Sequence, residues 1–177
     1  MTAAMAKPAM VSMSGDVRAA MRAIPLGDDY WGYIRDIKDA SAAILAPISR
    51  GALLGIDSLI GQETLEVEGY CEPWDHPTWV YLGKWRFDNE DDAWPPPKYS
   101  YDILNPEIIQ IYDRGRLERT KDRTRIQGMK KDEGLCFPGH LVMKIRSLHN
   151  MDSDPEEINR FAPLTSNWQP QESSNPI

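Results

Sequence analysis

The sequence predicts an α+β fold with N-terminal helices, a central aromatic-rich β-hairpin, a proline-rich strap, short C-terminal helices and extended termini. Apolar residues recur at intervals of three and four near the N-terminus, whereas they alternate with polar residues in the middle of the chain. The chain also has 14 prolines and 6 tryptophans. This composition indicates extended segments that are held in place by large flat side chains.

The length of 177 residues suits one domain, and 41% hydrophobic residues suffice for a core. We divide the chain into an N-terminal arm over 1–27, a single small domain over 28–161 and an extended tail over 162–177. Acidic residues outnumber basic ones 27 to 20, and the resulting net charge of -7 argues against a general nucleic-acid coat. Two cysteines are too few for a disulfide-stapled secreted scaffold.

The N-terminal arm lacks the continuous apolar segment of a secretory signal. It is rich in Ala, Met and Ser, it carries Lys7, Arg18 and Arg22, and it has no acidic residue before Asp16. An ordinary flexible arm is the preferred interpretation of this composition, and organelle targeting is the alternative. We expect an intracellular protein, with a mitochondrial or other organellar location favoured.

A first helix is predicted over about 29–46, with Asp28 or Asp29 as its cap and Pro47 at its end. Its apolar positions lie three and four residues apart, at Tyr30, Ile34, Ile37, Ile44 and Leu45. The most hydrophobic stretch, 40–61, is not predicted to span a membrane, because Arg50 lies near its middle and such a charge costs about 2.5–3.5 kcal/mol. A helix pair packed on the core is preferred for this stretch, and contact with a membrane surface or a partner's groove is the alternative.

Alternation with a period of two predicts strands over 64–70 and 78–87, joined as a hairpin by the intervening loop. One face of the second strand carries four aromatic residues, Trp79, Tyr81, Trp85 and Phe87. We expect this face to pack under the N-terminal helices. Stacking of nucleic-acid bases is the alternative, although the acidic segment that follows would repel phosphates.

The strap over 94–106 contains three consecutive prolines, which favour an extended polyproline II segment. It is expected to lie against this protein or a neighbour, or to dock in an aromatic-lined groove. A helix is predicted to begin at Asn105, and eight basic residues follow between 114 and 131 against two acidic ones. This basic run is expected either to contact RNA, anionic lipid or an acidic partner, or to pair with the chain's own acidic segment over 72–92. The candidate partner-binding residues are Trp94, Pro95, Pro96, Pro97, Tyr99, Arg114, Arg116, Arg119, Arg123 and Arg125.

Two short helices are predicted near the C-terminus. Leu141, Ile145 and Leu148 share one helical face, and Asp154 followed by Pro155 has the pattern of a second helix start. The tail that follows has the composition of a disordered segment.

Both cysteines and two of the three histidines fall into two short pairs, Cys71 with His76 and Cys136 with His140. Two closely spaced pairs of sulfur and nitrogen ligands are typical of structural zinc sites. The spacings are not those of a zinc knuckle, so two buried thiols and a disulfide between the cysteines remain alternatives. Structural zinc is the one cofactor that the sequence suggests.

The sequence contains none of the common nucleotide-binding, hydrolase or metalloprotease motifs. We therefore predict a non-enzymatic accessory or structural subunit of a large multiprotein complex that ties neighbouring subunits together through its arms. The 40–61 stretch and the N-terminal composition are compatible with a membrane-associated organellar complex, such as a mitochondrial one. Its expected partners are other protein subunits, with nucleic acid less favoured and no small-molecule substrate. A zinc-stabilised nucleic-acid-binding module and a virion structural component are the alternatives.

Overall fold

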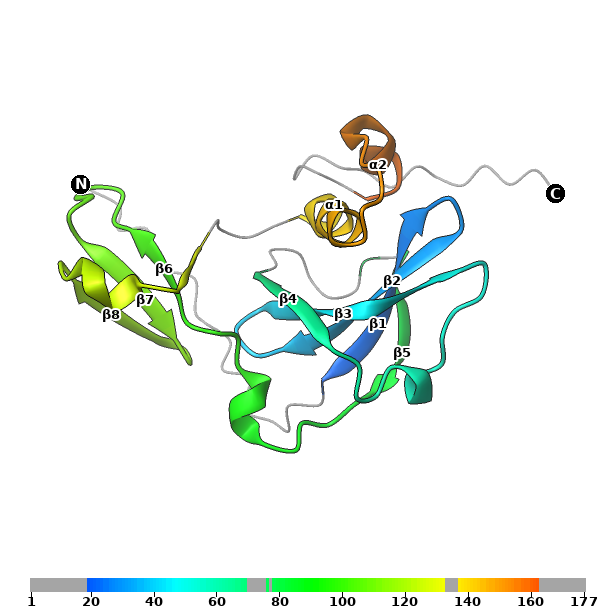
Figure 1. Cartoon of the computed structure of the whole chain (residues 1–177), viewed down its shortest axis with the longest axis horizontal. Coiled ribbons are helices and arrows are strands. Elements are labelled where there is room, and N and C mark those ends of the chain that lie inside the picture. Colours follow the sequence, from blue (N-terminus) through cyan, green and yellow to red (C-terminus); the bar gives the residue numbers. More distant parts are fainter. Residues whose placement is uncertain (1–18, 70–75, 77, 133–136, 163–177) are drawn as a thin grey trace, which may run out of the picture.

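The computed structural model describes residues 19–69, 76, 78–132 and 137–162. Within these ranges the chain forms two β-sheets and two short α-helices (Figure 1). The fold is therefore mostly β, and the expected α+β arrangement with N-terminal helices is wrong.

The first sheet has five antiparallel strands in the order β4-β3-β2-β1-β5. Their bounds are β1 Ala20–Gly27, β2 Tyr30–Ile37, β3 Ser41–Arg50, β4 Thr64–Gly69 and β5 Val80–Lys84. The second sheet has the order β8-β7-β6-β9, and only its β6–β9 pair is parallel. Its strands are β6 Lys98–Tyr101, β7 Ile109–Asp113, β8 Arg116–Thr120 and β9 Lys130–Lys131. The helices are α1 Pro138–Leu148 and α2 Pro155–Phe161, with short 3-10 turns η1 Ile56–Ser58, η2 Glu90–Ala93 and η3 Arg123–Ile126.

The helix predicted over 29–46 is instead a hairpin of β2 and β3. Ile34 and Ile44, which would share a helical face, are cross-strand partners. The chain reverses at Asp39 and Ala40, both of which have positive φ angles, 59° and 44°. Two successive residues in this conformation favour the tight turns that suit the twist of antiparallel strands. The apolar residues spaced three and four apart therefore belong to two paired strands and not to one helix.

The hydrophobic stretch over 40–61 is likewise β3 followed by η1, not a helix pair. Pro47 lies where the β2–β3 register shifts, between the pairs Gly32–Ile48 and Ile34–Ile44. Such an irregularity tolerates a proline, because proline has no N–H group to donate to the ladder. None of the helices in the described ranges has both the length and the apolar character needed to cross a bilayer.

Two of the predicted strands exist, but they do not form a hairpin. β4 pairs with β3 and β5 pairs with β1, so these strands lie at opposite edges of the first sheet. The alternation of apolar and polar residues predicted each strand correctly. It could not predict that β3, β2 and β1 lie between the two strands in the sheet. The four aromatic residues do not cover one common face either: Trp79 packs with the helices, whereas Tyr81 is 53% exposed.

The helix predicted to begin at Asn105 is a turn followed by β7. The Asn105 side chain accepts a hydrogen bond from the Glu107 amide (3.2 Å), and the Ile108 amide donates to the Asn105 carbonyl (2.9 Å). The β-branched residues that follow favour a strand over a helix.

The C-terminal helices are confirmed, and they cover one face of the first sheet (Figure 1). Ile24, Ile34 and Ile44 of the sheet pack there against Leu141 and Ile145 of α1. The opposite face has its own smaller core, made of Met21, Ala23, Tyr33, Leu45 and Leu59. The central strands β1, β2 and β3 therefore contribute buried side chains to both faces of the sheet.

Gly32 permits the close packing of α1 on the sheet. A Cβ atom at this position would lie 2.8 Å from Cγ2 of Ile145 and 3.3 Å from the Leu26 side chain. These neighbours are buried, so they have little room to move.

We predict that Gly32→Ala lowers the free energy of unfolding by about 1–3 kcal/mol through overpacking, measured by urea unfolding. Gly55→Ala is the matched control, because Gly55 has φ -71° and a methyl group added to its Cα would meet no atom within 4 Å. That control should leave stability unchanged or raise it by about 0.4–1 kcal/mol. Equal effects of the two changes would contradict the packing described here.

Candidate protein-binding groove

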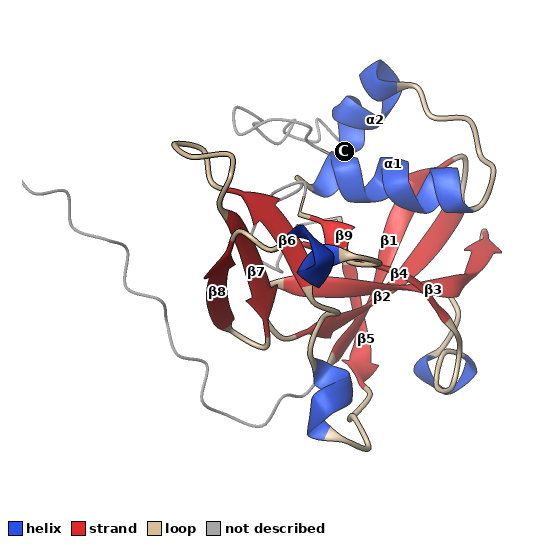
Figure 2. Cartoon of the chain, turned by 60° about the vertical axis from the view of Figure 1, so that its left-hand side comes forward, coloured by secondary structure: helices blue, strands red, loops and turns tan. Residues whose placement is uncertain are grey.

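A groove of about 480 Å³ runs along the outer edge of β4. All six residues of β4 line it on one side, and residues 95–98 and 128–130 line it on the other, together with Ser41 and Asp132. We call it the β4 groove. Figure 2 shows β9 between β6 and the strands of the first sheet, and β9 belongs to the sheet of β6.

Both walls of the β4 groove include the terminal strand of a sheet. Among the described strands, β4 pairs only with β3, and β9 pairs only with β6. An edge strand turns alternate N–H and C=O groups away from its partner, and these groups can pair with another chain. The groove thus presents backbone hydrogen-bonding groups along β4 from Thr64 to Glu68.

Charged side chains connect the two walls. Glu66 and Glu68 of β4 both bind Lys130 of β9, at 2.5 and 2.6 Å, and both lie near Lys144 of α1, at 3.1 and 3.4 Å. The two glutamates point to the same face because side chains alternate along a strand. This cluster fixes β9 and α1 relative to the edge of the first sheet.

The cluster perturbs the pKa values of its members. Partial burial alone would raise the pKa of Glu66, but hydrogen bonds from Lys130 and Lys144 and their positive charges outweigh it and lower that pKa. Burial would lower the pKa of each lysine, whereas the two carboxylates raise it instead. These shifts favour the charged forms of Glu66, Lys130 and Lys144.

The other side of β4 is apolar. Leu65 and Val67 line the groove together with Met129 and the three prolines of the strap. Prolines have no N–H group. The three consecutive prolines therefore cannot form a ladder of backbone hydrogen bonds with β4 that would close the groove.

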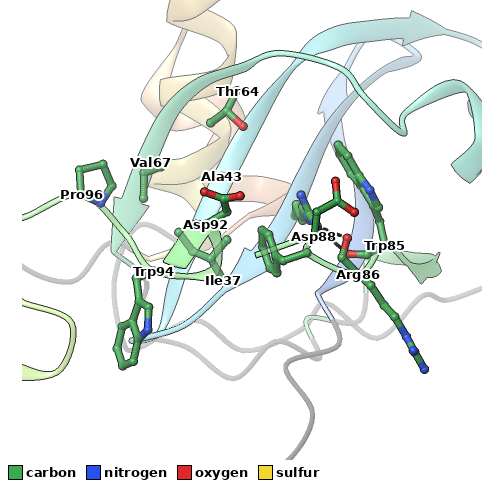
Figure 3. A pocket seen from close by; sticks show the side chains of 12 residues that line it. Ile37, Ala43, Thr64, Val67, Trp85, Arg86, Asp88, Asp92, Trp94 and Pro96 are labelled. Atoms are coloured by element: carbon green, nitrogen blue, oxygen red, sulfur yellow. Dashed lines mark hydrogen bonds between the residues drawn. The ribbon is translucent and has the colours of Figure 1, made fainter. Parts of the chain in front are cut away.

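A second cavity, of about 400 Å³, adjoins the groove, and the two share Thr64, Val67 and Pro96 (Figure 3). Its floor is a row of cross-strand neighbours, Arg35, Ala43 and Val67. Its other walls include Ile37, Trp85, Phe87, Asp88, Asp92 and Trp94. We call it the Arg35 cavity.

The Arg35 guanidinium is held between two aromatic rings. Its carbon lies 3.8 Å from the ring centroid of Trp85 and 3.4 Å from that of Phe87. It donates hydrogen bonds to the carbonyls of Trp85 (2.8 Å) and Arg86 (2.7 Å). Burial lowers the pKa of Arg35 to about 10, against the opposing effect of Asp88 and Asp92, so the side chain stays charged at neutral pH.

The predicted zinc site is untested, because Cys71 and Cys136 lie outside the described residues. His76 is buried, and its Nδ1 lies 2.8 Å from the Thr78 hydroxyl. His140 is exposed, and its Nδ1 accepts a hydrogen bond from the Phe137 amide (3.2 Å). No group of three or more metal-ligating side chains occurs among the residues that the structure describes.

The structure gathers some of the predicted partner-binding residues. Six of them line one hollow of about 600 Å³ beside Asp91 and Asp92, namely Trp94, Pro95, Pro96, Pro97, Arg114 and Arg116. Tyr99 lies on β6, where its ring meets that of Tyr101 edge to face, and Arg119 lies on β8. Arg123 and Arg125 belong to η3, away from this hollow.

Several of these arginines pair with the chain's own acidic residues. Arg114 binds Asp91 at 2.8 Å. This ion pair joins the basic run to the acidic segment over 72–92, which is one of the two arrangements expected from the sequence. Arg125 makes two hydrogen bonds to Glu118, at 2.8 and 2.9 Å. The basic run is therefore partly neutralised within the fold.

The turn between β6 and β7 exposes two large aliphatic side chains, Ile103 (96%) and Leu104 (95%). The turn is held by Asp102, whose carboxylate accepts from the Leu104 and Asn105 amides at 2.9 and 3.1 Å. The sequence interpretation missed this feature because it placed the segment in the strap. An Asp residue followed by two aliphatic residues and Asn-Pro is a turn signal that could have indicated it.

Comparison with protein-family models, with curated proteins and with solved structures finds no match to this chain. The groove and the cavity are therefore interpreted from their own geometry.

We predict that the Glu66 cluster stabilises the fold in a pH-dependent way. Since the pKa of Glu66 is lowered in the folded chain, its contribution is complete above the ordinary value of 4.5 and is lost as the pH falls through the folded-state value. Glu66→Gln should therefore reduce stability at pH 7, and the difference from the unaltered chain should shrink towards pH 3.

Urea unfolding at several pH values measures this effect, with Glu63→Gln as the control, since Glu63 is an exposed neighbour of β4. A Glu66→Gln difference that is independent of pH would contradict the role assigned to the ion pairs.

Proposed function

We propose that this chain is a non-catalytic subunit of a larger protein assembly, and that it binds a neighbouring protein by pairing an extended segment of that protein with β4. The observation that carries this proposal is the β4 groove, in which the outer edge of a strand lines a hollow of about 480 Å³. Addition of a strand to an exposed sheet edge is a common mode of peptide recognition.

The walls of the groove suit an extended occupant. Backbone hydrogen bonds contribute about 0.5–1.5 kcal/mol each, so pairing with six residues of β4 alone gives modest affinity. Leu65, Val67 and Met129 supply the apolar surface that such a complex also needs. A strand in this position would lie between β4 and β9, the terminal strands of the two sheets.

A protein partner is favoured over nucleic acid. Phosphate binding requires basic side chains that are free to replace counterions. Here Arg114, Lys121 and Arg125 each bind a carboxylate of the same chain, at 2.8, 3.0 and 2.8 Å. The charges that remain suit contact with another protein better than a continuous phosphate backbone.

The turn with Ile103 and Leu104 supports an assembly with more than one neighbour. Two adjacent aliphatic side chains that are almost fully exposed on a hydrogen-bonded turn form a contact surface for a protein. This turn lies at the far end of β6 from Pro95, Pro96 and Pro97, which line the groove. The β4 groove and this turn can therefore bind different partners, as expected for a subunit that links neighbouring proteins.

We predict that Leu65→Lys abolishes assembly in the cells that make the protein. A lysine on an edge strand opposes pairing with another strand, because its charge would have to be desolvated. Leu53→Lys is the matched control, since Leu53 is 39% exposed, Leu65 is 38% exposed, and Leu53 does not line the groove.

The measurement is the native mass of tagged chains in gentle extracts, together with the proteins that purify with them. The unaltered chain and the Leu53→Lys variant should migrate in a large complex, whereas the Leu65→Lys variant should migrate near its own mass of 20.1 kDa. Assembly of all three chains would refute binding through the β4 groove, and migration of all three alone would refute the subunit role.

A further inference from the structure

We propose that the Arg35 cavity receives a lysine or arginine side chain from the segment that pairs with β4. This inference rests on the proposed strand addition and names the side chain that gives it specificity. In strand addition, backbone bonds provide general affinity, and pockets for alternate side chains select the sequence.

The cavity is placed to receive such a side chain. It adjoins the β4 groove, since Thr64, Val67 and Pro96 line both. A strand paired with β4 would direct every second side chain to the face that carries Val67. Val67 also lies in the row that forms the floor of the cavity. A long side chain on that face would therefore enter the cavity.

The side of the cavity next to β4 combines apolar surface with negative charge. Ile37, Val67 and Pro96 offer aliphatic contacts, and the indole of Trp94 offers an aromatic face. Trp94 already holds one cation, since Lys38 Nζ lies 4.6 Å from its ring centroid. A long side chain with an aliphatic stem and a cationic head matches this combination.

Two carboxylates are available for the cationic head. Neither Asp88 nor Asp92 makes a side-chain hydrogen bond or an ion pair within 4.0 Å with any residue that the structure describes, although both act on Arg35 at longer range. Figure 3 shows the Asp92 carboxylate among Ile37, Ala43 and Val67. An acidic side chain would be repelled here, and an apolar one would desolvate the carboxylates without compensation.

Arg35 does not occupy the place of the proposed cation. Its guanidinium is stacked between Trp85 and Phe87 and bound to two backbone carbonyls, and it faces two carboxylates with a single charge. Arg86 also lines the cavity, but its guanidinium points away from the other labelled side chains (Figure 3). The two carboxylates, which are solvent-exposed, therefore outnumber the one guanidinium that they face.

The charge of the surrounding chain agrees with a basic partner. Residues 19–97 contain fourteen acidic and six basic side chains. A surface with this excess attracts a basic segment and speeds its encounter with the groove.

The test is selection of a displayed library of random ten-residue peptides on the purified chain. The unaltered chain should select β-branched, extended sequences with lysine or arginine at one fixed position. Asp88→Asn combined with Asp92→Asn should select similar sequences without that basic position. The control pair Asp28→Asn and Asp57→Asn makes the same change in net charge outside the cavity and should keep it.

Affinity measurements on a selected peptide then quantify the effect. Replacing its basic residue with methionine should weaken binding to the unaltered chain about tenfold, and should change binding to the Asp88→Asn, Asp92→Asn variant by less than about twofold. The single variant Asp92→Asn gives the same comparison if the double variant folds poorly.

The outcomes separate the two proposals. An extended consensus without a fixed basic position, or a basic position that survives loss of both carboxylates, would overturn the cavity inference and leave strand addition intact. Absence of any extended consensus, or a consensus that binds equally well to the Leu65→Lys variant, would overturn strand addition itself.

Discussion

The architecture depends on two tight reversals of the chain in the first sheet. Asp28 and Asp29 reverse it between β1 and β2, and Asp39 and Ala40 reverse it between β2 and β3, with positive φ angles at all four residues. The second turn joins the strands in which Arg35 pairs with Ala43, and pairing of β4 with β3 adds Val67 to the same row. That row is the floor of the Arg35 cavity, and β4 becomes an edge strand because it is added outside β3.

Two sets of polar contacts connect β9, α1 and the segment after β5 to this sheet. On one face, Lys130 and Lys144 hold β9 and α1 to the glutamates of β4. On the other face, Arg35 holds the segment after β5 by stacking and by hydrogen bonds to backbone carbonyls. Neither set of contacts pairs a described strand with the outer edge of β4. The outer edge of β4 therefore lines a groove that can accept another strand.

The sequence predicted local structure correctly where a residue pattern fitted only one type of secondary structure. Alternation identified β4 and β5, an apolar helical face identified α1, and an Asp-Pro helix start identified α2. It failed over 29–46, because Ile34 and Ile44 are partners across a hairpin whose turn, Asp39-Ala40, lacks the usual Asn-Gly or Asp-Gly signal. The β4 groove could not be predicted, since an edge exists only once all strand pairings are known. The strap and Arg114 were predicted contact residues, whereas Arg35 was not, because its environment comes from residues fifty positions away.

The most direct test of the central claim is amide hydrogen exchange along β4, with and without a bound partner segment. If β4 is an open edge, alternate amides over 64–68 should exchange rapidly in the free chain, and binding of a selected peptide should protect those same amides. Uniform protection of β4 in the free chain, or no change in its exchange on binding, would contradict strand addition at this edge.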